Sequence, residues 1–102
     1  MCIICSGSYD PSLTILLCSN CPNLTEIPKE LSNLKMIYCS NCPNLTKIPK
    51  EFTSLTSLCC RECPKLNEIP KEFTRLTLLY CNKCPNLTEI PKEFNLFYYI
   101  MV

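Results

Sequence analysis

The dipeptide Cys-Pro recurs along this chain with a fixed 21-residue period. The four copies are Cys21-Pro22, Cys42-Pro43, Cys63-Pro64 and Cys84-Pro85. An Ile-Pro dipeptide follows each of them with the same period, starting with Ile27-Pro28. A fixed period of about 20 to 50 residues is typical of proteins built from stacked repeats. This periodicity therefore restricts the fold more than any other feature of the sequence.

Seven positions of the 21-residue unit are apolar or Cys in all four copies, without insertions. In the first copy they are Leu13, Leu16, Cys18, Cys21, Leu24, Ile27 and Leu31. The spacing of Leu16 and Cys18 places both on one face of a short strand, and stacked copies would pair these strands in parallel about 4.8 Å apart. Pro22 and Pro28 disfavour helix and sheet in the rest of the coil. Extended or 3₁₀ turns are expected there.

The unit L-x-x-L-x-C-x-x-C-P-x-L-x-x-I-P resembles the leucine-rich-repeat signature L-x-x-L-x-L-x-x-[NC], and the resemblance covers residues 13–102. Its C-P-x-L-x-x-I-P portion also resembles short repeats of plant immune receptors. It is still more similar to tandem-repeat proteins of giant DNA viruses that infect amoebae, of the Marseillevirus or mimivirus type. The resemblance implies an α/β-type solenoid that is mostly β, with one short parallel strand per coil and a concave face that binds other proteins.

The chain is predicted to form one domain that consists of a cap segment and a solenoid. Residues 1–12 form the N-terminal cap segment, and the solenoid of residues 13–102 divides into coils 13–33, 34–54, 55–75 and 76–96 and a partial terminal strand 97–102. Cys2 to Cys5 lie outside the register and are expected to form a short capping strand. The 21-residue period places Phe97 in the opening column, Ile100 in the second and Val102 in the first Cys column. No polar capping unit follows this strand, so Phe97, Tyr98, Ile100 and Val102 are expected to form an edge for self-association.

The outward positions of the strands form two rows that are more apolar than a solvated sheet face should be. One row is Ile15, Met36, Ser57, Leu78 and Tyr99, and the other is Leu17, Tyr38, Cys59, Tyr80 and Met101. A contiguous apolar patch usually marks an interface, and Arg61, Glu62 and Lys83 would form its polar rim. Recognition of a protein partner, from host or virus, and self-association into a homo-oligomer both remain open.

The cysteines allow several interpretations. Pairs such as Cys18/Cys21 and Cys39/Cys42 match a zinc-binding pattern, in which residues 22–38 separate the two pairs. Both columns fall on inward positions, however, which favours buried thiols that pack as small apolar side chains. A metal site and disulfides are the less favoured alternatives. Cys59 stands in an outward row instead, and a solvent-reachable thiol is expected there.

Composition argues against catalysis. The chain has no His, the commonest general base and metal ligand, and no Gly-rich phosphate loop, so no catalytic residue, metal or cofactor is predicted. Ten Lys+Arg against nine Asp+Glu give no reason to expect nucleic acid or a membrane as partner. No signal peptide is recognised, so the expected location is the cytoplasm (of the host, if viral) or a virion, and not the secretory pathway. The predicted function is a non-catalytic protein–protein interaction module. A self-associating structural or scaffold protein is the alternative, and a thiol- or zinc-binding protein is a weaker third.

Overall fold

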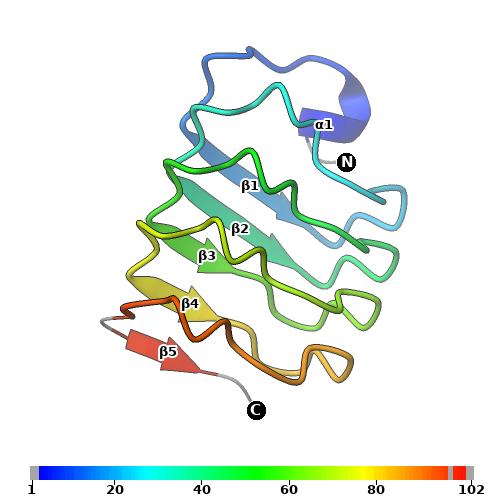
Figure 1. Cartoon of the computed structure of the whole chain (residues 1–102). Helices are drawn as coiled ribbons and strands as arrows, with labels where there is room; N and C mark the ends of the chain where they lie inside the picture. The colour runs from blue at the N-terminus through cyan, green and yellow to red at the C-terminus, as the bar shows by residue number, and fades with distance from the viewer. Residues whose placement is uncertain (1–2, 97, 101–102) are drawn as a thin grey trace.

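The chain folds into a stack of coils with a parallel sheet along one side. The computed structural model describes residues 3–96 and 98–100, the last three by their backbone. The strands are β1 (Ile15–Ser19), β2 (Met36–Ser40), β3 (Ser57–Cys59), β4 (Leu78–Tyr80) and β5 (Tyr98–Ile100). They follow one another in the order β1-β2-β3-β4-β5, each parallel to the next (Figure 1). This confirms the predicted mostly β solenoid with one short parallel strand per coil.

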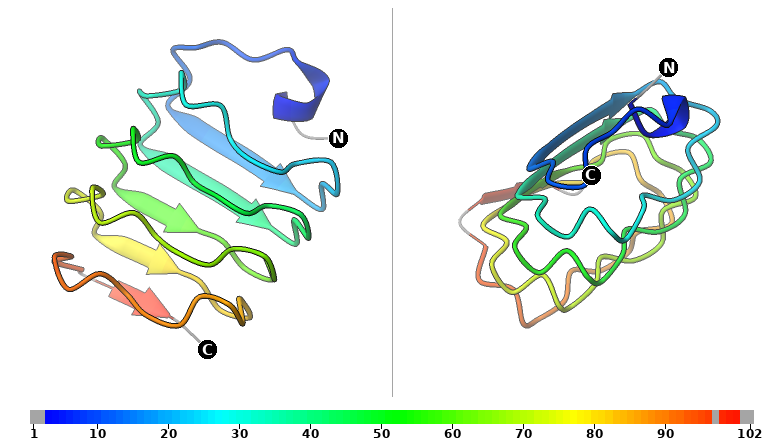
Figure 2. Two further views of the ribbon diagram at one scale, coloured as in Figure 1. Left: turned by 45° about the vertical axis from the view of Figure 1, so that its right-hand side comes forward. Right: turned by 90° about the horizontal axis from the view of Figure 1, so that it is seen from above.

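The register of the sheet repeats the sequence period from β1 to β4. Leu16 pairs with Ile37, Ile37 with Leu58, and Leu58 with Leu79, so that partners in the sheet are equivalent positions of the 21-residue unit. Seen from above the stack, the coils overlie one another, with the strands along one side and irregular backbone along the other (Figure 2). Equivalent residues of successive coils are therefore neighbours in space.

The return half of each coil consists of single turns, as the prolines predicted. Leu24 N donates to Cys21 O over 3.4 Å, and Leu31 N donates to Pro28 O over 3.2 Å. These i→i+3 bonds are of the 3₁₀ type but do not continue into a helix. Between coils, Thr46 N donates to Thr25 O over 3.0 Å. The turns are thereby tied to one another as well as to the sheet.

The seven predicted columns form the core. In the two central coils all seven positions are buried, with exposed fractions of 4% or less. At the ends of the stack Leu13, Ile90 and Phe94 are only partly buried, because a neighbouring coil covers them on one side. Each coil therefore depends on its neighbours to bury its apolar side chains, as expected of a solenoid.

The N-terminal segment is helical, and the predicted capping strand was wrong. Helix α1 (Ile3–Ser6) packs beside β1 at the start of the stack (Figure 1). Ile4, Cys5 and Tyr9 contact the core cluster, and the Tyr9 hydroxyl donates to Glu30 Oε1 over 3.1 Å. The segment covers the first coil by packing apolar side chains on it and therefore does not need to add a strand. Cys2 lies outside the described residues.

The register of β5 differs from the prediction by one position. Tyr98 pairs with Leu78 and Tyr99 pairs with Leu79, one position short of the 21-residue period that relates the other strands. The physical reason is a shorter connection: one residue separates Phe94 from Leu96, whereas two separate Phe73 from Leu76. Leu96 packs against the core cluster. The structure thus assigns the opening column to Leu96, where the period had placed Phe97.

Candidate functional site

The outward face of β1–β4, called the sheet face below, gathers exposed apolar side chains. Its two described rows are Ile15, Met36, Ser57 and Leu78, and Leu17, Tyr38, Cys59 and Tyr80. Ile15 is 51% exposed, Leu17 64%, and Met36 and Leu78 38% each. Among the described residues, one further large apolar side chain, Ile3 at 36%, is as open to solvent. The patch is therefore local to this face.

A hollow lies in the middle of the sheet face, where the third coil has small side chains. Ser57 and Cys59 of β3 form its floor with Leu58, between the larger side chains of β2 and β4. The full lining is Met36, Ile37, Tyr38, Ser57, Leu58, Cys59, Leu78 and Tyr80, and the volume is about 200 Å³. The sequence indicates this hollow, because Ser57 and Cys59 are smaller than the other residues of the two outward rows.

Cys59 is almost fully buried, so the prediction of a solvent-reachable thiol was wrong. It is 9% exposed, because Tyr38 and Tyr80 flank it in the sheet and have much larger side chains. Burial raises the pKa of the Cys59 thiol, and the positive charge of Arg61 opposes this rise in part. A thiol that is both covered and protonated reacts slowly with electrophiles. Cys59 thus belongs to the floor of the hollow.

The predicted rim residues Arg61, Glu62 and Lys83 are exposed just beyond the carboxyl ends of the strands. Glu62 has φ 56° and Lys83 has φ 61°, the left-handed region of the backbone. Asn20 and Asn41, their equivalents in the first two coils, share this conformation with φ 55° each. The sharp turn after each strand therefore recurs in all four coils, whatever residue occupies it.

The predicted C-terminal site residues are only partly covered by the structure. Tyr98, Tyr99 and Ile100 form β5 beside β4. The predicted place of Tyr99 in the row of Leu78 was wrong, because Tyr98 pairs with Leu78 and Tyr99 pairs with Leu79. Phe97, Met101 and Val102 lie outside the described residues. The proposed edge for self-association therefore remains a prediction.

The inward cysteines form hydrogen-bonded columns. Cys42 Sγ donates to Cys18 O over 3.6 Å, Cys63 Sγ to Cys39 O over 3.3 Å, and Cys84 Sγ to Cys60 O over 2.8 Å. Each thiol thus reaches a carbonyl group of the preceding coil. Burial raises the pKa of Cys60 and of Cys81.

Metal-binding side chains do not assemble within residues 3–96 and 98–100. In that part of the chain, no three of the Cys, Asp and Glu side chains gather in a way that could hold a metal ion. The zinc-like spacing of the C-x-x-C pairs follows from the repeat: one Cys of each pair lies in the strand or at its end, and the other lies in the turn after it.

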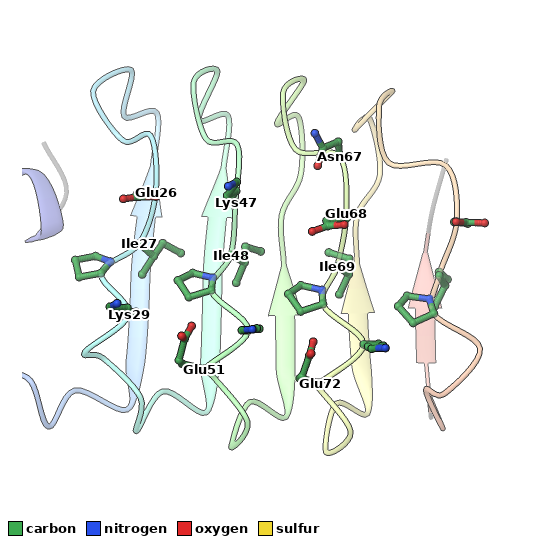
Figure 3. Close-up of a pocket in the computed structure, with 18 of the residues that line it drawn as sticks. Glu26, Ile27, Lys29, Lys47, Ile48, Glu51, Asn67, Glu68, Ile69 and Glu72 are labelled. Carbon is green, nitrogen blue, oxygen red and sulfur yellow. The ribbon is translucent and has the colours of Figure 1, made fainter.

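A shallow groove on the far side of the coils was not singled out by the sequence. It is lined by the Ile-Pro-Lys-Glu segments of the four coils and has a volume of about 1440 Å³. Figure 3 shows Ile27, Ile48 and Ile69 aligned in a row, with charged side chains on either side. Five lysines and six glutamates line it. Because these charges nearly cancel, the groove offers no strong field of either sign to a ligand.

Comparison with known families agrees with this geometry. The family described as Leucine Rich Repeat matches residues 12–34 and 33–55, the segments that contain β1 and β2. Two leucine-rich repeats are thus recognised, both within residues 12–55. A comparison with curated proteins finds no match. The two matched repeats share their columns, their turns and their strand register with the third and fourth coils.

The described residues contain no helix of the length and apolar character required to cross a bilayer.

Proposed function

We propose that this leucine-rich-repeat chain is a non-catalytic module that binds a protein partner through its sheet face. Domains of this family generally mediate protein–protein interaction. The observation that carries the proposal is the exposure of Ile15, Leu17, Met36 and Leu78 on one face. When a partner covers exposed apolar area, the free energy of the complex falls by about 25 cal/mol per Å² of area buried. A cluster of such side chains beside a charged rim is the usual anatomy of an interface.

The hollow over Ser57 and Cys59 supports a specific mode of binding. Its volume of about 200 Å³ is below the roughly 300–1,000 Å³ of pockets that hold small molecules. It suits a single apolar side chain, inserted between Tyr38 and Tyr80 as an anchor. Anchors of this kind dominate binding energy when they enter a well-packed, desolvated pocket. The partner is therefore proposed to be a protein segment with one protruding aliphatic or aromatic residue.

A second copy of the chain is the alternative occupant. Leu17 is 64% exposed on β1, two strands away from the β3 floor of the hollow on the same face. A two-fold related copy could insert its Leu17 into this hollow and receive the equivalent Leu17 in return, which is the self-complementary contact of a symmetric dimer. This arrangement would be the structural or scaffold role.

The proposal also includes the location of the protein and the origin of its partner. The resemblance of the C-P-x-L-x-x-I-P segment to viral repeat proteins supports a location in the host cytoplasm or with the virion, and a partner from host or virus. The lack of His supports a role without catalysis or cofactor.

The test selects displayed peptides on the immobilised chain and compares their affinities for two variants. Ser57→Leu fills the hollow from its floor without removing any other side chain. Asn67→Leu places the same side chain on the exposed far side of the same coil and is the matched control. We expect selected peptides to share one apolar residue, to lose about thirtyfold or more in affinity for Ser57→Leu, and to bind Asn67→Leu like the parent chain.

If the selected peptides bind the parent chain and Ser57→Leu with equal affinity, the hollow is not part of the binding site. Sedimentation of the chain alone decides between the occupants. A dimer that becomes a monomer in both Ser57→Leu and Leu17→Ser identifies the occupant as a second copy. A monomer at all concentrations excludes self-association through this face.

A further inference from the structure

The column of thiols that donate to a preceding coil starts at the second coil, because the cap segment and not a coil precedes the first. Cys42, Cys63 and Cys84 each donate to a carbonyl group of the preceding coil. Cys21 is the first member of this column and has no preceding coil. Helix α1 occupies that place, and there Cys5 Sγ lies 3.0 Å from Cys21 Sγ. The cap thus presents a sulfur atom where the other coils present an oxygen.

Cys5 also differs from the other cysteines in its exposure. It is the one partly exposed cysteine among the ten in the described part of the chain, and the other nine are buried. Cys21 is 2% exposed and lies behind it. Reagents in solution therefore reach Cys5 first, and Cys21 is in position to react with it. The pairing of an accessible thiol with a second, adjacent thiol is typical of cysteines that undergo reversible oxidation.

We propose that Cys5 and Cys21 form an oxidation site that closes to a disulfide in the presence of a peroxide. The Cys5 sulfur attacks one peroxide oxygen, the O–O bond breaks, and Cys5 becomes a sulfenic acid with release of water or alcohol. The Cys21 sulfur then attacks the Cys5 sulfur and releases water. Together the two thiols lose two protons and two electrons, and the peroxide gains them as it is reduced to water or to alcohol and water. A thiol reductant reverses the reaction.

The Cys5–Cys21 disulfide would strengthen the attachment of helix α1 to the first coil. Helix α1 has four residues, too few to be stable alone, and it is held by apolar contacts of Ile4 and Tyr9 and by the Tyr9–Glu30 hydrogen bond. A Cys5–Cys21 disulfide would tie this segment covalently to the first coil. Oxidation thereby converts a noncovalent cap on the first coil into a covalent one.

The sequence offers a clean assay. Asp10 is the sole Asp of the chain and precedes Pro11, so mild acid, which cleaves Asp–Pro bonds, separates residues 1–10 from residues 11–102. The full native chain is treated with equimolar hydrogen peroxide, its remaining thiols are alkylated in denaturant, and the acid fragments are weighed by mass spectrometry without reductant. We expect nine of the eleven cysteines to be alkylated and the two fragments to stay linked.

Single variants identify the pair. The link is expected to persist in Cys2→Ser and Cys18→Ser and to disappear in Cys5→Ser and Cys21→Ser. Cys5→Ser alters an accessible cap position, so it tests the pair even if Cys21→Ser fails to fold. Oxidation should also raise the midpoint of thermal unfolding by roughly 10 °C, and reductant should reverse the rise. Fragments that separate after peroxide, or that remain linked in Cys5→Ser, would overturn the proposal.

Discussion

Asn41 Nδ2 donates a hydrogen bond to Asn20 Oδ1 over 2.6 Å, so the turns after β1 and β2 are joined by their side chains. Both residues have φ 55°. Asn adopts this left-handed conformation more readily than other residues that carry a side chain. Glu62 and Lys83 hold the same conformation in the third and fourth coils without that preference. The repeat thus keeps its backbone at these two positions at some cost in free energy.

Substitution to Asn at these turns should stabilise the protein. We expect Glu62→Asn and Lys83→Asn each to raise the free energy of unfolding by about 0.5–1 kcal/mol, because the strain of a positive φ is reduced. Urea denaturation measures the change. The reverse substitution Asn41→Glu is the control and should lower stability by a similar or larger amount, since it also removes the bond to Asn20. Loss of stability in both Asn variants would contradict this explanation.

The thiol-to-carbonyl bonds should contribute to stability as well as filling space. Cys63 Sγ lies 3.3 Å from Cys39 O and 3.4 Å from Arg61 O, and the side chain is fully buried. Cys63→Ala removes the donor and leaves a small void, and we expect it to cost about 2 kcal/mol in the free energy of unfolding. Cys63→Ser keeps a donor of similar size and should cost less. If Ser proves as costly as Ala in urea denaturation, packing alone explains the column.

The strict period made most of the fold predictable. Seven columns repeat without insertion, so the inward positions of the coils could be assigned from the sequence, and the structure buries Leu34 and Phe52 as assigned. The prolines correctly predicted turns in place of helices. The register of β1 to β4 followed too, because pairing of equivalent residues is the only arrangement that buries every column at once.

The errors lie where the sequence leaves the period. The connection between Phe94 and Leu96 is one residue shorter than in the other coils, and this shifts the pairing of β5. The prediction counted 21 residues from the preceding coil and therefore assumed an unchanged connection. The N-terminal segment has no repeat to compare, and its helix depends on packing against the first coil. Cys59 pairs with Tyr38 and Tyr80 in the sheet. Its exposure depended on the size of the neighbouring side chains of Tyr38 and Tyr80. The position of a residue in the repeat does not include the size of its neighbours.

The covered position of Cys59 predicts its reactivity. In the parent chain we expect native-state alkylation of Cys59 to be much slower than in the unfolded chain, because the residue is 9% exposed and the pKa of its thiol is raised by burial. Tyr38→Ala removes the neighbour on one side and should increase the rate at least tenfold. Peptide mapping after timed alkylation measures this rate. Cys60, which faces the core, is the internal reference and should stay unreactive in both proteins.

Stability should fall in alkaline solution. Burial raises the pKa of Cys60 and Cys81 in the folded chain, whereas an unfolded thiol has a pKa of about 8.5. Below that value both states hold these protons and stability is unaffected. Above it only the unfolded state releases them, so each such thiol lowers the free energy of unfolding by about 1.4 kcal/mol per pH unit.

Urea denaturation under reductant between pH 7 and 9.5 measures the slope. Cys60→Ala lacks one of these thiols, so its stability should decline less steeply with pH, by about 1.4 kcal/mol per unit, although it starts from a lower value at pH 7. Parallel curves for the parent chain and Cys60→Ala would show that this thiol ionises equally in both states. Equal ionisation would require water to reach Cys60 in the folded chain, and this would contradict the complete burial of that side chain.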